Sequence, residues 1–222
     1  LLTASTSSGW FASNTFTDAK PVTGQGTPAV PNNPGGALVE TFLVSSTAGT
    51  GVIHSIVKIA SNDTFEQGYN SDFRNVQFDE TNAANFNRSI TLADIPVVDI
   101  NGVSYREFDL DLNEDNGGSN PLITLQTLMI FASDTNLLTG FNETTQTFPA
   151  GTATLIYDMD QAADISVLLT DWNSGSGTGD YAFFIPEAGV GSLPGFDGLP
   201  QGKYIYIYSE FGTLNGTGSG VS

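Results

Sequence analysis

Apolar and polar residues alternate along most of the chain, and this pattern predicts β-strands throughout. In YREFDLDL (105–112) apolar and acidic residues alternate in the second half, as expected for a strand with one buried face. In KYIYIY (203–208) Tyr204, Tyr206 and Tyr208 share one face and the isoleucines share the other. Gly, Asn, Asp or Pro bounds the further runs. The predicted strands span 37–44, 51–60, 73–79, 96–100, 103–112, 122–132, 152–159, 163–172, 181–186 and 203–211.

These strands predict the fold class. Sustained helical spacing with caps is absent from the sequence, and only a short helix is expected, near residues 80–90. The small-residue stretches STAGTG (46–51) and NSGSGTGD (173–180) are interpreted as hairpin connections. Many short strands without a βαβ rhythm predict an all-β protein, namely an antiparallel two-sheet β-sandwich that is jelly-roll-like.

The N-terminal region has a different composition. Residues 17–36 contain four prolines and four glycines, which predict an extended arm rather than a central strand. The chain is therefore divided into an N-terminal strand with its arm (1–36) and a β-sandwich domain (37–222). Two alternatives remain for residues 1–13. They form the first strand of the same sandwich, or they act as a donor strand that pairs with an edge strand of a neighbouring copy.

Charge narrows the range of partners. The 222 residues include 6 basic and 24 acidic ones, for a formal net charge of -18 and a sequence pI near 4.1. Such a surface repels phosphate, so we expect no nucleic-acid partner and no direct membrane insertion. Only 14% of the residues are charged, which favours a Thr-, Ser-, Asn- and Gly-rich surface typical of an exported protein. We interpret LLTASTSSGW as the start of a mature chain whose leader has been removed.

The residue types needed for common catalytic mechanisms are scarce. His54 is the single histidine and the chain has no cysteine, which argues against a nucleophilic triad and against histidine- or thiolate-bound zinc. In GVIHSIVKIA it shares a strand face with Lys58, the expected solvent side. The glycines of NSGSGTGD precede a strand rather than a helix, unlike a phosphate-binding loop. Nothing distinguishes Glu107, Asp180 or Glu187 as a glycosidase pair. We therefore predict that the protein is not an enzyme and has no catalytic residues.

One stretch, EFDLDLNEDNGGSN (107–120), has the spacing of a calcium loop. Asp109, Asp111, Asn113 and Asp115 are the candidate metal ligands. On a strand, residues i and i+2 lie about 6.6–7 Å apart, so one ion can join two of them, and a full site requires the chain to curl after Asp111. Glu114 and Asn120 stand where an EF-hand has glycine and glutamate, so this is not an EF-hand. Two alternatives stay open: a calcium ion (Ca²⁺) that staples a loop, or a strand that runs into an acidic turn.

Several strings resemble a known group of proteins. YREFDLDLNEDNGGSNPLITLQTLMIF, LLTDWNSGSGTGDYAFFIP and GKYIYIYSEFG occur in this order over roughly residues 103–211. They resemble exported bacterial proteins that carry a C-terminal PEP-CTERM sorting signal. The resemblance implies a secreted or surface-retained bacterial protein without a known catalytic activity, and it carries no functional residues. The sequence ends at GTLNGTGSGVS, without the sorting tripeptide of that group.

These observations favour a non-enzymatic extracellular structural protein. We expect the subunit of a filament, sheath or matrix that self-associates by β-strand addition through its N-terminal segment. The alternative is a carbohydrate-binding or adhesive surface module with polysaccharide as its ligand. That alternative requires exposed, flat aromatic rings, for which the sequence offers Trp10, Trp172 and the row Tyr204, Tyr206 and Tyr208.

Overall fold

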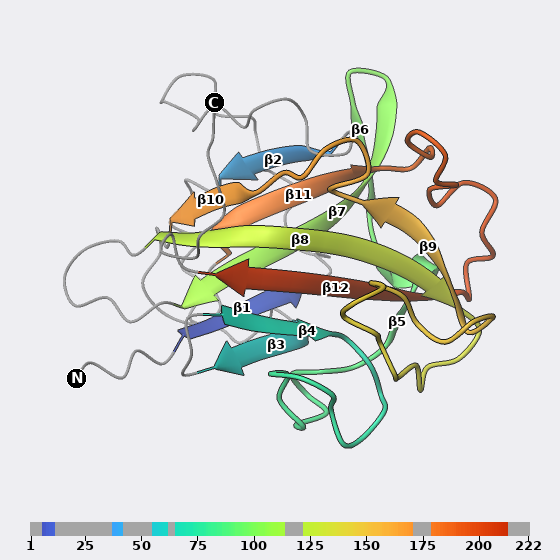
Figure 1. Ribbon diagram of the computed structural model, residues 1–222. Coiled ribbons are helices and arrows are strands. Elements are labelled where there is room, and N and C mark those ends of the chain that lie inside the picture. The colour runs from blue at the N-terminus through green and yellow to red at the C-terminus, as the bar shows by residue number, and fades with distance from the viewer. Residues whose placement is uncertain are drawn as a thin grey trace.

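The chain folds as two antiparallel sheets packed face to face. The computed structural model describes residues 6–11, 37–41, 55–61, 65–113, 122–170 and 179–212. Within these ranges each sheet has six strands, and the two sheets form the two layers seen in Figure 1. The prediction of an all-β, antiparallel two-sheet sandwich is therefore confirmed.

The first sheet, sheet A, is built around one long strand. β7 (Val103–Asn113) pairs along one edge with β11 (Tyr181–Pro186), which in turn pairs with β2 (Leu38–Thr41). Along its other edge, β7 pairs first with β6 (Val97–Ile100) and then with β1 (Thr6–Phe11). β3 (Ser55–Ser61) follows β1, so the path through the sheet is β2-β11-β7-β1-β3. β1 thus belongs to the sandwich, as the first of the two N-terminal alternatives expects.

The second sheet, sheet B, is organised in the same way around two long strands. β8 (Leu122–Ser133) pairs with β12 (Tyr204–Gly212) along most of its length. The other edge of β8 carries β10 (Val167–Thr170) and β9 (Ala153–Asp158). The other edge of β12 carries β4 (Phe65–Tyr69) and β5 (Ile90–Thr91). Each long strand therefore holds two short strands end to end on one edge.

Apolar side chains from both sheets fill the space between them, because apolar residues recur at every second position of the long strands. Phe108 and Leu110 of β7 are buried in the same apolar cluster as Ile205 and Ile207 of β12. Burial of such side chains is the main favourable term in folding, about 1.5–3 kcal/mol for each large apolar side chain. The predicted division of KYIYIY into an isoleucine face and a tyrosine face is confirmed, because the tyrosines belong to a different cluster.

That other cluster lies on the outer face of sheet B. Tyr206 and Tyr208 are fully buried there, and the Tyr208 ring stacks on Phe141 with 4.0 Å between ring centroids. Phe78 contacts the edge of the same Tyr208 ring. The segments around Phe78 and Phe141 thus form an additional layer over the sheet. The strand predicted for 73–79 is wrong, because this segment packs the partly buried Phe78 into the covering layer without pairing as a strand.

The connections differ from three sequence-based expectations. β2 and β3 lie at opposite ends of the path through sheet A, so the predicted hairpin between them does not form. β10 and β11 lie in different sheets, so these two strands do not form the predicted hairpin. The Tyr181 hydroxyl accepts a hydrogen bond from the Thr170 N–H at 2.8 Å and so links β10 of sheet B to β11 of sheet A. In place of a helix near 80–90, the chain forms a turn at 84–86 and a 3-10 helix at Leu92–Asp94.

Candidate functional site

The outer face of sheet A carries a row of buried acids on β7. Glu107, Asp109 and Asp111 alternate with the core residues Phe108 and Leu110, so they point to the opposite face. Their relative exposures are 5%, 1% and 3%. The sequence predicted that the acids and the core residues lie on opposite faces of β7, with the acids in solvent. The acids do lie on the opposite face, but they are buried there, so this part of sheet A is covered on both faces.

Asp180 joins the same part of the sheet from β11's side. Its backbone N–H donates to the Leu110 carbonyl at 2.8 Å, and its Oδ2 accepts the Leu112 N–H at 2.8 Å. Asp180 directly precedes Tyr181, which pairs with Leu110, so it lies next to Asp111 across the two strands. This carboxylate extends the β11–β7 ladder by one hydrogen bond beyond the end of the strand.

The predicted metal ligands are only partly brought together. β7 continues as a paired strand through Asn113, which lies opposite Ser7 of β1, so the chain does not curl after Asp111. Asp109 and Asn113 are four strand residues apart, roughly 13 Å, which is too far for one ion to join both. Asp115 lies outside the described residues. Among the described residues, no group of three or more His, Cys, Asp or Glu side chains is placed to hold a metal ion. The arrangement that remains for calcium is the neighbouring pair Asp109 and Asp111.

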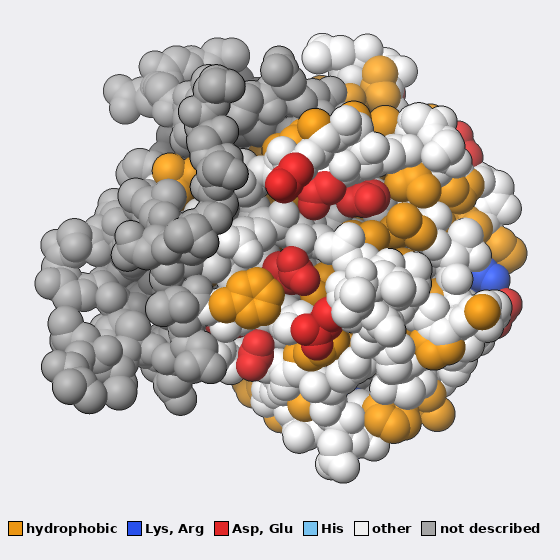
Figure 2. All heavy atoms as spheres, in the orientation of Figure 1, with side chains coloured by type: hydrophobic (Ala, Val, Ile, Leu, Met, Phe, Trp, Pro, Cys, Tyr) orange, Lys and Arg blue, Asp and Glu red, His pale blue; other side chains and the backbone are white. Residues whose placement is uncertain are grey.

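A second group of acids lies on sheet B and was not predicted. Asp158 ends β9 and Asp160 follows it, and Glu210 of β12 and Asp164 are near enough to affect Asp160. Burial, followed by repulsion from these carboxylates, raises the pKa of Asp160 to about 6, although a hydrogen bond from the Ile165 N–H opposes the shift. Figure 2 shows acidic side chains gathered over the middle of the face it draws. Proton uptake near pH 6 is the chemistry that this group can perform.

Glu80 is a buried acid, and each of its two carboxylate oxygens accepts a hydrogen bond from the backbone. Its Oε1 accepts the Tyr69 N–H at 2.9 Å and its Oε2 accepts the Phe78 N–H at 2.7 Å. Burial raises the pKa of Glu80, and these two donors oppose part of the shift. A buried carboxyl with a raised pKa is a general sign of a catalytic site. Here both oxygens are used to attach the segment at Phe78 to β4, so Glu80 is a structural residue.

Glu187, which the sequence analysis considered for a glycosidase pair, forms an ion pair with Arg106. Arg106 donates to both of its oxygens, at 2.5 Å and 2.8 Å. The remaining Arg106 donor, Nη1, binds the Leu92 and Ile95 carbonyls at 3.1 Å and 2.7 Å. The pair therefore fastens the 3-10 helix and the loop after β11 to β7. This bidentate geometry suits Arg and leaves Glu187 unsuited to act on a substrate.

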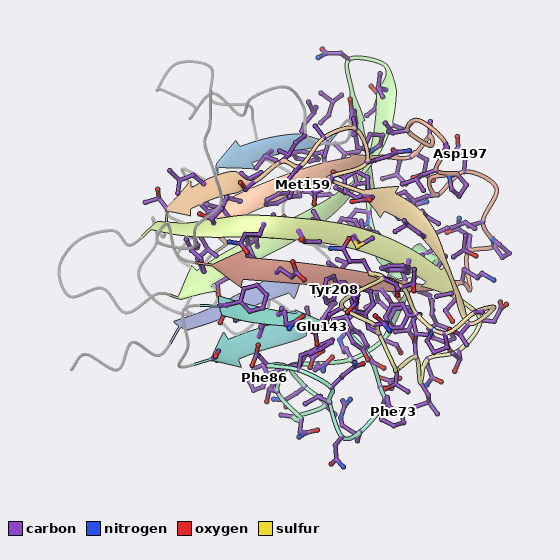
Figure 3. The ribbon with its side chains drawn as sticks, in the orientation of Figure 1. Phe73, Phe86, Glu143, Met159, Asp197 and Tyr208 are labelled. Atoms are coloured by element: carbon purple, nitrogen blue, oxygen red, sulfur yellow. The ribbon has the colours of Figure 1, made fainter. Side chains whose placement is uncertain are left out.

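The tyrosine row does not form an exposed aromatic platform. Tyr206 and Tyr208 have 0% exposure, and Tyr208 lies on β12 in the middle of Figure 3. The Tyr206 hydroxyl donates to the Thr135 carbonyl, which ties the covering layer to the sheet. The exposed aromatic rings among the described residues are Phe65, Phe73 and Phe86. Trp172 and His54 lie outside the described residues, and only the backbone of Trp10 is described.

The most distinctive arrangement is the place of β1 in sheet A. It lies between β3 and β7, antiparallel to both, and these two strands are not neighbours in the sheet. Trp10 lies opposite Val57 on one side and Leu110 on the other, and both of these residues are buried in the core. The slot between β3 and β7 is therefore defined by two strand edges that only an inserted strand can join.

Comparisons with known proteins give no further identification. No family model, no curated protein and no solved structure matches the chain. Within the described ranges, no helix has the length and apolar character needed to span a bilayer. The class that fold and site define is therefore an acidic β-sandwich whose N-terminal strand fills an interior slot.

Proposed function

We propose that this protein is a non-enzymatic extracellular structural protein, the subunit of a filament, sheath or matrix that self-associates by β-strand addition. The observation that carries the proposal is the interior position of β1. The N-terminal strand supplies the backbone partners of both β3 and β7, and the proline- and glycine-rich residues 17–36 separate it in sequence from β2. Strand addition is an established way in which subunits are joined through main-chain hydrogen bonds.

The chemistry of the described acids agrees with a structural role. Glu80, Asp180 and Glu187 each bind backbone or Arg106 donors that hold strands and loops together. A net charge of -18 keeps a surface soluble and disfavours anionic partners. The resemblance to exported PEP-CTERM-type proteins supports a bacterial surface or extracellular location, which stays a prediction.

The alternative, a carbohydrate-binding or adhesive module, has less support. It depends on aromatic rings that lie flat on an exposed surface, and two of the three tyrosines of the predicted row, Tyr206 and Tyr208, are buried in the layer over sheet B. Phe65, Phe73 and Phe86 are exposed, but none of them belongs to the aromatic residues that the sequence offered for this role. Selective binding on a glycan array would favour this alternative over the structural one.

Deletion of residues 1–20 tests the assembly part of the proposal. We expect the full chain to form assemblies that sediment faster as concentration rises, and the deleted chain to lose them. Since removal of β1 exposes two strand edges, the deleted chain is also measured after addition of a peptide with the sequence of residues 1–13, which fills the slot without linking subunits. An unchanged distribution of assemblies after deletion contradicts the proposal.

A further inference from the structure

We infer that β1 is exchanged between copies: the β1 strand of one chain fills the slot between β3 and β7 of a second chain. This inference rests on the proposed function and specifies its partner, which is another copy of the same chain, and its site. It also changes the form of the sequence-based expectation. The donor strand enters the interior of a sheet, whereas the sequence suggested addition to an exposed edge.

The first argument is the state of the slot without β1. β3 and β7 are joined only through β1, whose register runs from Thr6 opposite Ser61 to Phe11 opposite Ser55, and from Ser7 opposite Asn113 to Phe11 opposite Asp109. Withdrawal of β1 would leave two rows of backbone donors and acceptors without their ladder partners, which is costly for buried groups. The slot must therefore be filled, either by the same chain or by another.

The second argument is that exchange preserves every pairing. A β1 strand from a second copy has the same sequence and enters with the same register, so it forms the same ladder with β3 and β7. The choice between the two arrangements depends on the connection and on concentration, as in domain swapping. Residues 12–37 separate β1 from β2, and a segment of this length spans up to roughly 80 Å when extended. This is long enough to reach a neighbouring sandwich.

The third argument is that the slot specifies one register. Ser8 lies between Ile59 and Leu112, and Trp10 lies between Val57 and Leu110. All four of these partner residues belong to the core cluster. Because the side-chain period of a strand is two residues, a shift of β1 by one residue would break this pairing along both ladders at once. The pairing of β1 with β3 is regular from Thr6 to Trp10, and its register shifts between Trp10 and Phe11.

The fourth argument concerns the form of the product. Donor strand and acceptor slot are different surfaces of the chain, so the contact between two copies is heterologous. Repetition of a heterologous contact gives a ring when it closes and an open filament when it does not. Exchange of β1 from chain to chain gives the extended assembly that the proposed function requires when the contact does not close.

Cysteine cross-linking tests the exchange, since the natural chain contains no cysteine. Ser7 of β1 lies opposite Ala60 of β3, and Ala60 is exposed. Antiparallel partners have Cα atoms about 4.5–5.5 Å apart, within the range that a disulfide bridges. One chain carries Ser7→Cys and a second, isotopically heavy chain carries Ala60→Cys. The two are refolded together from denaturant and oxidised, and the masses of the cross-linked species are measured.

Two controls make the result decisive. A chain with both Ser7→Cys and Ala60→Cys reports whether the two thiols meet when β1 is in the slot. Refolding Ser7→Cys with Thr145→Cys measures accidental disulfides, because Thr145 is exposed in a loop of the layer over sheet B. We expect a light–heavy cross-link for the Ser7 and Ala60 pair at several-fold the yield of the Thr145 control.

The outcomes separate this inference from the proposed function. Assemblies without the light–heavy cross-link overturn the exchange and leave the structural role standing. The cross-link in closed dimers alone supports the exchange and overturns the filament. A doubly substituted chain that forms no disulfide overturns the placement of β1 on which the inference depends.

Discussion

The Asn70 side chain binds the backbone of β12 at Ile207, as a neighbouring strand would. Its Oδ1 accepts the Ile207 N–H at 2.7 Å, and its Nδ2 donates to the Ile205 carbonyl at 3.0 Å. β4 pairs with β12 from Tyr208 onward and β5 pairs with it up to Ile205, so Asn70 covers the gap between the two short strands. One buried side chain thus completes the edge of sheet B.

Replacement of Asn70 by Ala is expected to destabilise the protein by about 3 kcal/mol. The change leaves a buried N–H and a buried carbonyl without partners, and each such group costs about 1–3 kcal/mol. Chemical denaturation gives the free energy of unfolding. Asn85→Ala, at an exposed position in the turn at 84–86, is the matched control and should change stability by less than about 0.5 kcal/mol. Equal effects of the two changes would contradict this role of Asn70.

Arg106 and Lys203 provide a second matched comparison. The side chains of Arg106 and Glu187 are 5% and 18% exposed, whereas Asp134, the partner of Lys203, is 93% exposed. Arg106→Met leaves Glu187 and two backbone carbonyls without their donor, and we expect a loss of about 3–5 kcal/mol. Lys203→Met should cost less than about 1 kcal/mol, because solvent screens that pair. Thermal unfolding of both variants checks the difference. A small effect of Arg106→Met would mean that the pair does not fasten the 3-10 helix.

The pKa of Asp160 predicts a pH dependence with a definite sign. Its pKa is raised from 3.8 to about 6 by burial and by repulsion from Asp158, Asp164 and Glu210. The folded state therefore holds the proton more tightly than the unfolded state, so this contribution to stability is complete below pH 4 and is lost as pH rises through 6. Asp160→Asn should stabilise the protein at pH 7.5 by about 1 kcal/mol, after allowance for solvent screening, and should have no effect at pH 3.5.

The melting temperature of Asp160→Asn and of the natural chain, measured across this pH range, gives the comparison. Asn keeps the oxygen that accepts the Ile165 N–H, so the hydrogen bond is preserved. Asp197→Asn, at an exposed carboxylate, is the control and should not respond to pH in this way. A stabilisation by Asp160→Asn that is the same at both pH values would show that repulsion is not its cause.

Calcium at Asp109 and Asp111 remains a prediction with a direct test. Two buried carboxylates at neighbouring positions on one face repel each other, and a divalent cation between them would offset that repulsion. Calcium should then raise the melting temperature of the natural chain above its value in a chelator. The rise should disappear in Asp111→Asn and persist in Asp197→Asn. An unchanged melting temperature of the natural chain in calcium would contradict a calcium site at Asp109 and Asp111.

Several elements could be predicted from the sequence because the signal is local. Alternation located β7 and β12, placed Phe108 on the face of β7 opposite the acids, and separated Ile207 from the tyrosines, while a short apolar run located β11. β4 and β5 were missed, because FEQGY mixes polar residues with glycine and a two-residue strand has no period. Contacts between residues that lie far apart in the sequence were also missed. Alternation gives the face on which Asp109 lies, but its burial depends on distant parts of the chain, as does the approach of Glu210 to Asp160.

Electron microscopy of the purified 222-residue chain, imaged over a range of concentrations, tests the structural role most directly. The account predicts filaments or sheets with a regular repeat of one sandwich, formed without added nucleic acid or membrane. Separate particles of single-chain size at every concentration would contradict it.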